Sequence, residues 1–385
     1  DTADTAVEAW DQRCIDFSFV DLQPNVVCTS TFVRTADVRS TIDLVSRAVL
    51  DSLRKRPGAE HELIQTGTRL TRMILHAEVA HRLFSFEEGT PVVIRPDSWC
   101  AAIPWELCYC TSKKKFLSEH LALSRGTVRY SEIEESVEYM CADGRMYVQE
   151  CCFFFNPDND PAFAGDGEKL VALGREMKKG GFADTITVLS NGIDRPSFDG
   201  AVSACSILHY VGHIRYQADK GSYIAFTGRG LDAPDVRAIL QGARRPAFVF
   251  LNGCTSDRPP VIDLKHLSEQ TGFVRAFYDA GVHLVLGTRW PIDMATAQDI
   301  QSILFRQLMS KGLRVGEALR RYRIDARQRS MVWAAYVLYG DPRLEFCIPK
   351  KGSASHALQE PGLAPAVGRH PTDRAPQLIS LVLDQ

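Results

Sequence analysis

The sequence predicts an α/β protein in which helices flank a mostly parallel sheet and an N-terminal α+β half packs onto that sheet. Three observations support this prediction. Between Cys151 and Gly287, short apolar runs alternate with segments whose apolar residues recur at helical spacing, which is the pattern of βαβ units. Gly and Pro residues separate many of these segments, as expected for turns. Two of the apolar runs, at residues 206–213 and 247–254, end in a glycine followed by a reactive side chain.

The N-terminal half begins with a predicted β-hairpin. Apolar residues partly alternate over residues 15–33, and Pro24-Asn25 in the middle is a turn signal. Residues 36–55 and 60–83 carry apolar side chains at helical spacing, so we expect two helices that pack as a pair. A short strand is predicted over residues 91–96. The acidic segment 132–144 is expected to be a surface connection between the two halves.

The second half is more regular. Strands are predicted over residues 151–157, 184–189, 207–211, 222–227, 247–251 and 282–287. Helices are predicted over residues 169–178, 197–205, 233–241, 268–279, 295–309, 315–324 and 333–339. A phosphate-cradling glycine motif is missing from the sequence, which disfavours a flavodoxin-like nucleotide-binding domain.

Composition narrows the function classes. The chain has 385 residues, 45% of them hydrophobic, and a formal net charge of −2, so charge gives no reason to expect nucleic acid as a partner. No apolar run approaches the roughly 18 residues that span a bilayer, and we expect no membrane association. The 11 scattered cysteines favour a reducing, cytoplasmic setting over a disulfide framework. They lack the paired spacing of a zinc site, so we expect neither metal nor another cofactor.

The two reactive residues are His213 and Cys254, each directly after a predicted strand. Ligands of open α/β sheets bind at the carboxyl ends of the strands, and an imidazole beside a thiol is a base next to a nucleophile. Gly212 and Gly253 precede them and permit close backbone approach. The backbone N–H groups of Cys254 and Ile214 are candidate donors to an oxyanion.

Residue types alone leave other interpretations open. A cysteine after a core strand is commonly just buried, and a histidine there is commonly hydrogen-bonded within the structure. His209 competes with His213, but it lies inside the apolar run, whereas His213 lies at its exposed end. His283 opens a strand and is expected to be structural.

Four ordered motifs resemble the CHAT family of caspase-like cysteine peptidases, which is grouped with separases, caspases and gingipains. They are ILHYVGH, FVFLNGC, GVHLVLGTRWPIDMATA and WAAYVLYGDP. Upstream, VVIRPDSWCAAIPWELCY followed by FLSEHLALSR is similar to the N-terminal half of that family, where a Pro-Trp-Glu motif recurs. The resemblance runs from about Ile15 to Phe346 and implies a caspase-like fold.

The resemblance implies roles for the residues. His213 would be the general base and Cys254 the nucleophile, with an oxyanion hole from the backbone at Cys254 and near His213. An acidic residue after Trp290 recognises substrate in relatives, and Asp293 is the candidate, although it could equally cap the next helix. Asp257 is a second candidate that could simply lie on a surface loop. Trp105 and Glu106 of the Pro-Trp-Glu motif are expected to be structural.

The resemblance also implies an organisation. We expect a hairpin at residues 1–35, a pseudo-caspase-like or regulatory half at 36–148, a catalytic caspase-like half at 149–348, and a flexible tail at 349–385 apart from the apolar segment 378–383. The expected function is a cytoplasmic endopeptidase that cuts a protein partner, switched on by a sensor or regulatory protein in bacterial defence or programmed death. The alternative is a catalytically silent caspase-like interaction module.

The chain departs from the family at two places. Ile214 follows the histidine where relatives often have glycine. Residues 255–267 form a longer, proline-containing stretch than usual, which we interpret as a loop that covers the cleft or controls activation.

Overall fold

The computed structural model describes residues 12–20, 27–53, 57–96, 100–126, 145–156, 165–190, 194–217, 221–224, 226, 230–241, 245–253, 273–290, 292, 294–327, 331–347 and 377–382. The chain divides into two compact units. Unit 1 comprises residues 1–128, 323–334 and 375–385, and unit 2 comprises residues 129–322 and 335–374. Two segments distant in sequence therefore complete unit 1. The predicted connection at residues 132–144 lies outside the described residues.

Unit 1 contains five neighbouring strands in the order β2-β1-β17-β3-β6. Its strands are β1 (Gln12–Val20), β2 (Val27–Arg34), β3 (Pro91–Arg95), β4 (Tyr109–Cys110), β5 (Lys115–Phe116), β6 (Ala122–Arg125) and β17 (Gln377–Val382). Its helices are α2 (Thr35–Leu53), α3 (Ala59–Ile74), α4 (Ala77–Ser85) and the short α5 (Leu117–His120). The antiparallel pairing of β1 with β2 confirms the predicted hairpin. Strand β17 pairs antiparallel with β1 and parallel with β3.

The predicted helix over residues 60–83 is two helices in the structure. Helix α3 ends at Ile74, and the following residue Leu75 has extended backbone angles. His76 then caps α4, because its ring nitrogen Nδ1 accepts a hydrogen bond from the Glu78 N–H at 3.3 Å. The apolar spacing continues across this break, so periodicity alone does not reveal it. A side chain that satisfies an orphan N–H starts a new helix here.

A buried ion pair organises the Pro-Trp-Glu segment of unit 1. Glu106 is held by two bonds from the Arg125 guanidinium, at 2.8 Å and 2.6 Å. The same guanidinium donates to the carbonyls of Ala101 and Ile103, at 2.7 Å and 2.9 Å. Trp105 is buried and donates its indole N–H to a backbone carbonyl. Trp105 and Glu106 are therefore structural, as the sequence predicts.

Replacing Arg125 with Lys should lower the free energy of unfolding by roughly 2 kcal/mol. A lysine keeps the charge but cannot reproduce the planar fork, so it leaves buried carbonyls without donors. Urea unfolding monitored by circular dichroism measures the change. The control is Arg69→Lys at an exposed position of α3, which should shift stability by less than about 0.5 kcal/mol. Equal stability of the two variants would contradict the structural role.

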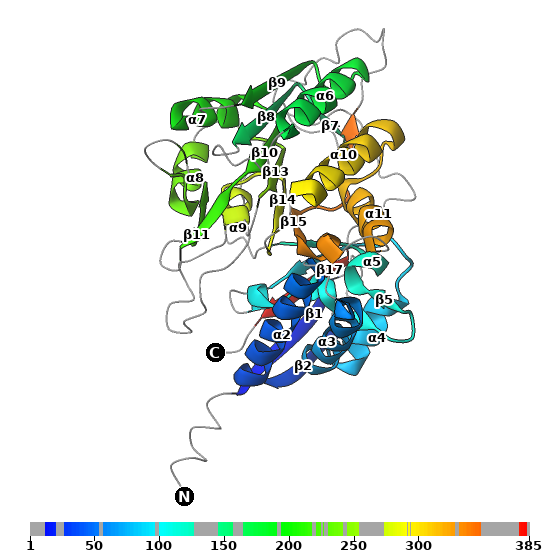
Figure 1. Ribbon diagram of the computed structural model, residues 1–385. Coiled ribbons are helices and arrows are strands. Elements are labelled where there is room, and N and C mark those ends of the chain that lie inside the picture. The colour runs from blue at the N-terminus through cyan, green and yellow to red at the C-terminus, as the bar shows by residue number, and fades with distance from the viewer. Residues whose placement is uncertain are drawn as a thin grey trace, which may run out of the picture. The chain divides into compact units, whose positions relative to one another are not determined.

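Unit 2 contains six neighbouring strands in the order β15-β14-β13-β10-β8-β9 (Figure 1). Strands β9, β8, β10, β13 and β14 run parallel, and β15 is antiparallel to β14. The strands are β7 (Met146–Tyr147), β8 (Glu150–Asn156), β9 (Thr185–Ser190), β10 (Ile207–Gly212), β11 (Ile214–Gln217), β12 (Gly221–Ile224), β13 (Phe248–Asn252), β14 (Leu284–Thr288), β15 (Tyr336–Gly340) and β16 (Phe346–Cys347). The mostly parallel α/β fold class is thus confirmed.

Helices cover both faces of the unit 2 sheet. In Figure 1, α6 (Asp166–Lys179) and α10 (Met294–Lys311) lie on one side. Helices α7 (Arg195–Ala204), α8 (Ala233–Leu240) and α9 (Phe273–Asp279) lie on the other. Helix α11 (Val315–Arg327) follows α10 and continues into unit 1. Because both faces are covered, the inner parallel strands β8, β10, β13 and β14 are largely buried and mostly apolar. The described residues of β9, the last strand in the order, are partly or fully exposed.

The prediction of a helix over residues 333–339 is wrong. The structure has a short 3-10 turn (Met331–Ala335) and then strand β15, which pairs with β14 so that Tyr339 lies opposite Val285. Every residue of β15 is buried. A short, wholly apolar run has no polar face, so its periodicity does not distinguish helix from strand.

Candidate functional site

The candidate site lies at the carboxyl ends of β10 and β13 in unit 2. These strands are parallel neighbours, with Val211 opposite Asn252. One further residue along each strand brings Gly212 opposite Gly253. His213 follows β10 directly, and residue 254 follows Gly253 in the chain. Parallel register therefore brings the backbone that carries His213 next to the backbone that precedes Cys254.

The two glycines allow the strand ends to approach closely. A Cβ added at Gly253 would lie 2.6 Å from the Gly212 carbonyl oxygen and 2.8 Å from Cγ1 of Ile214. A Cβ at Gly212 would overlap the carbonyl oxygen of Asn156 at the end of β8. Neither position has room for a larger residue, so glycine is a steric requirement of the site.

A hydroxyl group fixes the backbone at His213. The Tyr210 hydroxyl donates to the His213 carbonyl oxygen at 3.0 Å, and the side-chain amide of Asn156 donates to the same hydroxyl at 3.4 Å. Tyr210 is fully buried, whereas His213 is partly exposed. The ends of β8 and β10 are thus joined by side chains, and the partly exposed imidazole sits on an anchored backbone.

Two more hydroxyls fix the end of β13. Thr288 of β14 donates to the Gly253 carbonyl oxygen, and Tyr336 of β15 donates to the side-chain oxygen of Asn252 at 2.8 Å. All four residues are buried. The backbone directly before Cys254 is therefore held from a neighbouring strand, which is the kind of support that precise positioning requires.

The sequence did not indicate this supporting set of Asn156, Tyr210, Thr288 and Tyr336. Tyr210 and Tyr336 lie within apolar runs, where their rings suggest only packing. Their positions in the sequence could have indicated this role. Asn156, Thr288 and Tyr210 lie at or near the carboxyl ends of predicted strands, where a polar side chain can reach the edge of the sheet at which ligands bind.

Ile214 begins a hairpin that the sequence did not predict in full. Strand β11 pairs antiparallel with β12, with Ile214 opposite Ile224. Ile224 exchanges both backbone hydrogen bonds with Leu231, at 3.0 Å and 2.9 Å. The pair of Ile214 with Ile224 is therefore not hydrogen-bonded, and the Ile214 N–H points away from β12. The Ile214 side chain is buried in the core.

His209 is structural. Its ring is fully buried and stacks on Phe250 with centroids 4.5 Å apart. Nδ1 lies 3.1 Å from the Phe250 carbonyl oxygen, to which it donates, and Nε2 lies 2.9 Å from the side-chain amide of Gln301 on α10. Burial lowers the pKa of His209 to about 4, so the ring is neutral at pH 7. This agrees with the choice of His213 over His209.

We expect His209 to make unit 2 less stable in acid. Its folded pKa of about 4 lies below the ordinary 6.5, so below pH 6.5 the unfolded chain binds a proton that the folded protein does not. Stability is retained above pH 6.5 and lost as the pH falls towards 4, by about 2 kcal/mol between pH 7.5 and 5.

The measurement is urea unfolding at these two pH values for wild type and His209→Asn, whose amide still offers a donor to the Phe250 carbonyl. The asparagine variant should lack this part of the pH dependence. His61→Asn, at an exposed position, should retain it. An unchanged pH dependence in His209→Asn would contradict the assignment.

The described cysteines are free thiols, and several are poor nucleophiles. Burial raises the pKa of Cys108, Cys151 and Cys205 above that of an ordinary thiol. These thiols remain protonated near neutral pH, and it is the thiolate that attacks a carbonyl. Among the described residues, no group of three His, Cys, Asp or Glu side chains has the geometry of a metal site.

The other predicted site residues fall outside the part of the chain that the structure describes. These are Cys254, the two acidic candidates Asp257 and Asp293, and the whole stretch 255–267. Of the predicted set, the described residues Gly212, His213, Ile214 and Gly253 come together at the ends of β10 and β13.

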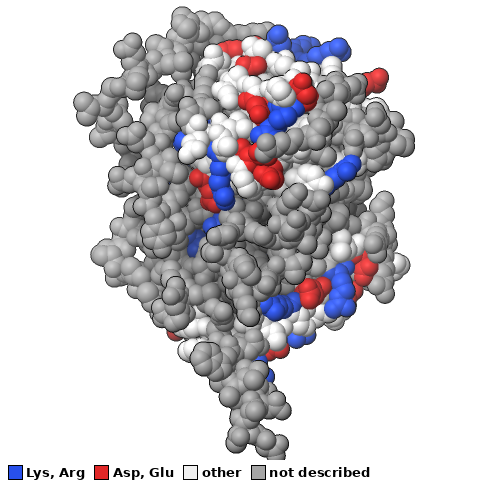
Figure 2. Space-filling model, turned by 90° about the vertical axis from the view of Figure 1, so that its left-hand side faces the viewer, with Lys and Arg blue, Asp and Glu red and all other residues white. Residues whose placement is uncertain are grey.

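The surface shown in Figure 2 carries mixed charge. Lys and Arg side chains lie among Asp and Glu side chains over the described residues of this face, and neither sign forms a continuous patch. A one-signed patch is the usual electrostatic footprint of a nucleic-acid interface. None of the described helices is long and apolar enough to cross a membrane.

We compared the sequence and the structure with those of known proteins. A family model of the CHAT domain matches residues 65–341. Among solved structures, the chain is similar to one in the Saccharomyces cerevisiae separase–securin complex, with 16% identity and a TM-score of 0.46 over 65% of this chain and 15% of that one. It is similar to the Arg-specific cysteine proteinase gingipain R, with 13% identity and a TM-score of 0.45 over 60% of this chain and 56% of that one.

A secreted C11 cysteine protease from Bacteroides thetaiotaomicron, solved with an irreversible peptide inhibitor, has 12% identity and a TM-score of 0.31 over 47% of this chain and 59% of that one. The chain spans less than two thirds of each of these structures. At such identities the likeness concerns the fold alone. No curated protein matches the sequence.

Proposed function

Because this chain belongs to the CHAT domain family, we propose that it is a cysteine endopeptidase with Cys254 as nucleophile and His213 as general base. One observation carries the proposal: β10 and β13 are parallel neighbours whose ends meet at Gly212 and Gly253. Gly253 is followed directly by Cys254, and Gly212 is followed directly by His213. Because consecutive Cα atoms lie 3.8 Å apart, each reactive residue is one residue away from the place where the two strand ends meet.

The chemistry is acyl transfer in two steps. The His213 imidazole takes the proton of the Cys254 thiol, and the thiolate sulfur attacks the carbonyl carbon of the scissile peptide bond. The imidazolium then gives its proton to the leaving amine, the C–N bond breaks, and a thioester remains. Water attacks the thioester with His213 again as base, which releases the carboxyl product and restores the thiol.

An oxyanion forms in both steps, and we propose the backbone N–H groups of Cys254 and Ile214 as its donors. The Ile214 N–H points away from its hairpin partner, which supports this role. Preorganised donors of this kind commonly contribute 10²–10³-fold to the rate. The hydroxyls of Tyr210 and Thr288 would preserve the geometry by holding the carbonyl groups of His213 and Gly253.

We further propose Asp293, with Asp257 as the second candidate, as the acidic residue that recognises the substrate side chain next to the scissile bond. A partner with a basic residue at that position would fit. Residues 149–348 are proposed as the catalytic half, residues 36–148 as a pseudo-caspase-like or regulatory half, residues 1–35 as a hairpin and residues 349–385 as a tail. The free thiols of the described cysteines fit a reducing compartment, so we propose a cytoplasmic effector of defence or programmed death under a sensor protein.

The test is covalent labelling. The protein is treated with a fluorescent acyloxymethyl ketone peptide that carries Arg or Lys next to the reactive carbon, and the modified residue is identified by mass spectrometry. We expect modification at Cys254 in wild type, much slower modification in His213→Ala, and slower modification in Asp293→Asn. Labelling that never occurs at Cys254, together with no cleavage of any protein from neighbouring genes, would support the silent interaction module instead.

A further inference from the structure

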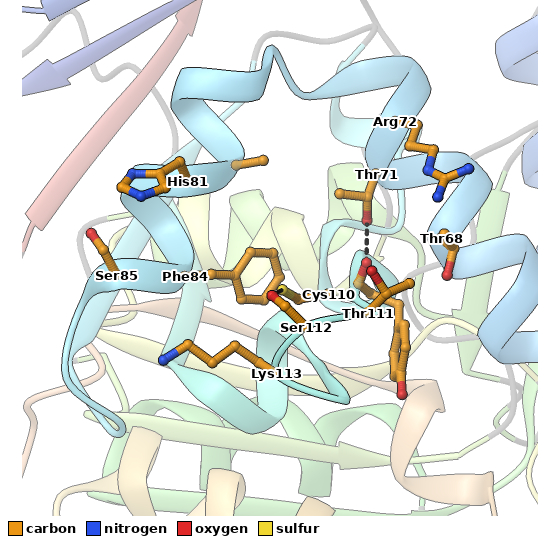
Figure 3. A pocket seen from close by; sticks show the side chains of 12 residues that line it. Thr68, Thr71, Arg72, His81, Phe84, Ser85, Cys110, Thr111, Ser112 and Lys113 are labelled. Atoms are coloured by element: carbon orange, nitrogen blue, oxygen red, sulfur yellow. Dashed lines mark hydrogen bonds between the residues drawn. The ribbon is translucent and has the colours of Figure 1, made fainter.

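Unit 1 contains a cavity that the proposed catalysis does not use. It has a volume of about 460 Å³ and lies between α3, α4 and the turn at residues 111–114 that links β4 to β5 (Figure 3). Ligand sites commonly have volumes of about 300–1,000 Å³. The cavity is therefore large enough for a small metabolite.

The chemistry of its wall favours an anion. Arg72, His81 and Lys113 line the cavity, and the remaining lining residues include no Asp or Glu. Figure 3 shows Arg72 with Thr68 and Thr71 on one side, and His81 with Ser85 on the other. Guanidinium and ammonium groups are the usual partners of phosphate, the former as a bidentate fork.

These basic groups are not occupied by the protein itself. Within the described part of the chain, the side chains of Arg72, His81 and Lys113 make no hydrogen bond or ion pair. Lys115, two residues beyond Lys113, differs because it pairs with Glu88 at 2.6 Å. The basic side chains that line the cavity are thus available to a ligand.

The buried part of the cavity wall is aromatic and closely packed. Phe84 and Tyr109 are 5% and 7% exposed. The Thr71 hydroxyl donates to the Gly67 carbonyl at 2.9 Å and to the Tyr109 carbonyl at 3.2 Å, which ties α3 to β4. A Cβ on Gly67 would lie 2.5 Å from a backbone oxygen of the adjacent segment. The cavity is therefore formed before any ligand binds, and its aromatic wall suits an organic ring.

A neighbouring hollow has a different character. It has a volume of about 580 Å³, shares Thr68 and Arg72 with the first, and includes Asp37 and Arg69. A carboxylate in its wall opposes an anion. Because only the cavity with His81 and Lys113 lacks a carboxylate in its wall, we assign the anion to that cavity.

We propose that the cavity of unit 1 binds a small organic phosphate of mononucleotide size. The basic groups Arg72, Lys113 and His81 that line the cavity attract the phosphate, and the organic ring lies over Phe84 and Tyr109. This site is in a different unit from His213 and does not depend on the peptidase proposal.

Isothermal titration calorimetry on the full chain tests the site with three probes: AMP, ribose 5-phosphate and inorganic phosphate. We expect AMP to bind most tightly, because it alone adds a ring to the phosphate. The double variant Arg72→Gln/Lys113→Gln should weaken AMP binding about tenfold or more, since each charge-assisted hydrogen bond contributes roughly a factor of ten. The matched control is Arg69→Gln/Lys114→Gln, two exposed basic residues on the same helix and turn that lie outside this cavity.

The control variant should bind AMP within about twofold of wild type. Circular dichroism and the unfolding midpoint establish that both variants fold. The proposal is overturned if AMP does not bind wild type, if all three probes bind equally, or if the two double variants weaken binding to the same extent. The last two outcomes indicate general charge attraction in place of a built site.

Discussion

Replacement of either Cys254 or His213 by alanine should reduce kcat/KM for peptide cleavage by at least about 10³-fold. Without the thiol there is no acyl-enzyme, and without the imidazole the thiol stays mostly protonated and the leaving amine receives no proton. Residues that act as a unit give non-additive losses. The double variant should therefore be no slower, within error, than the less active of the two single variants.

The measurement is cleavage of a protein substrate, or of a peptide identified by labelling, under single-turnover conditions. Two matched controls use residues of unit 1: Cys110→Ala at a partly exposed free thiol and His61→Ala at an exposed imidazole. Both should retain wild-type rates. Cleavage by Cys254→Ala at the wild-type rate would show that another residue is the nucleophile.

The strands of unit 2 could be predicted because several kinds of sequence signal agree there. The apolar runs of β8, β10, β13 and β14 are short, rich in β-branched or aromatic residues, and separated by helical segments. Local propensity and long-range pairing then favour the same structure. The positions of Gly212 and Gly253 follow from the same reasoning, since both lie at or just beyond strand ends in the structure.

The remaining features depend on contacts between residues far apart in sequence. Strand β15 is a strand because it pairs with β14, about 50 residues earlier in the chain. Strand β17 lies between β1 and β3, which come from the first hundred residues. Hydroxyls such as those of Tyr210 and Thr288 gain their roles only when neighbouring strand ends are in register. No local pattern records such contacts.

The two histidines of β10 illustrate how position separates similar side chains. His209 is enclosed by aromatic rings and bonded at both nitrogens, and burial lowers its pKa so that it carries no charge at pH 7. His213 lies beyond the last strand residue and is partly exposed. A general base needs access to the substrate and to solvent protons, so the end of the strand, not its interior, is the place for it.

Gly253 offers the sharpest test of the idea that close strand ends create the site. In Gly253→Ala, the new methyl group would lie 2.6 Å from the Gly212 carbonyl oxygen and 2.8 Å from Cγ1 of Ile214. The first of these is backbone, so the strand ends must separate by a sizeable fraction of an ångström. A misplacement of about 1 Å can reduce turnover 10²-fold, and we expect kcat to fall by about that factor.

The control is Gly200→Ala on α7, where a new Cβ meets nothing within 4 Å. Alanine is favoured over glycine inside a helix by roughly 1 kcal/mol, so this variant should be fully active and slightly more stable. Rates of labelling at Cys254 show where the damage lies in a slow Gly253→Ala enzyme. If the thiol reacts normally with a small alkylating agent but slowly with the peptide ketone, the damage lies in the alignment of His213, Cys254 and the oxyanion donors. Wild-type cleavage by Gly253→Ala would mean that the distance between the ends of β10 and β13 does not control catalysis.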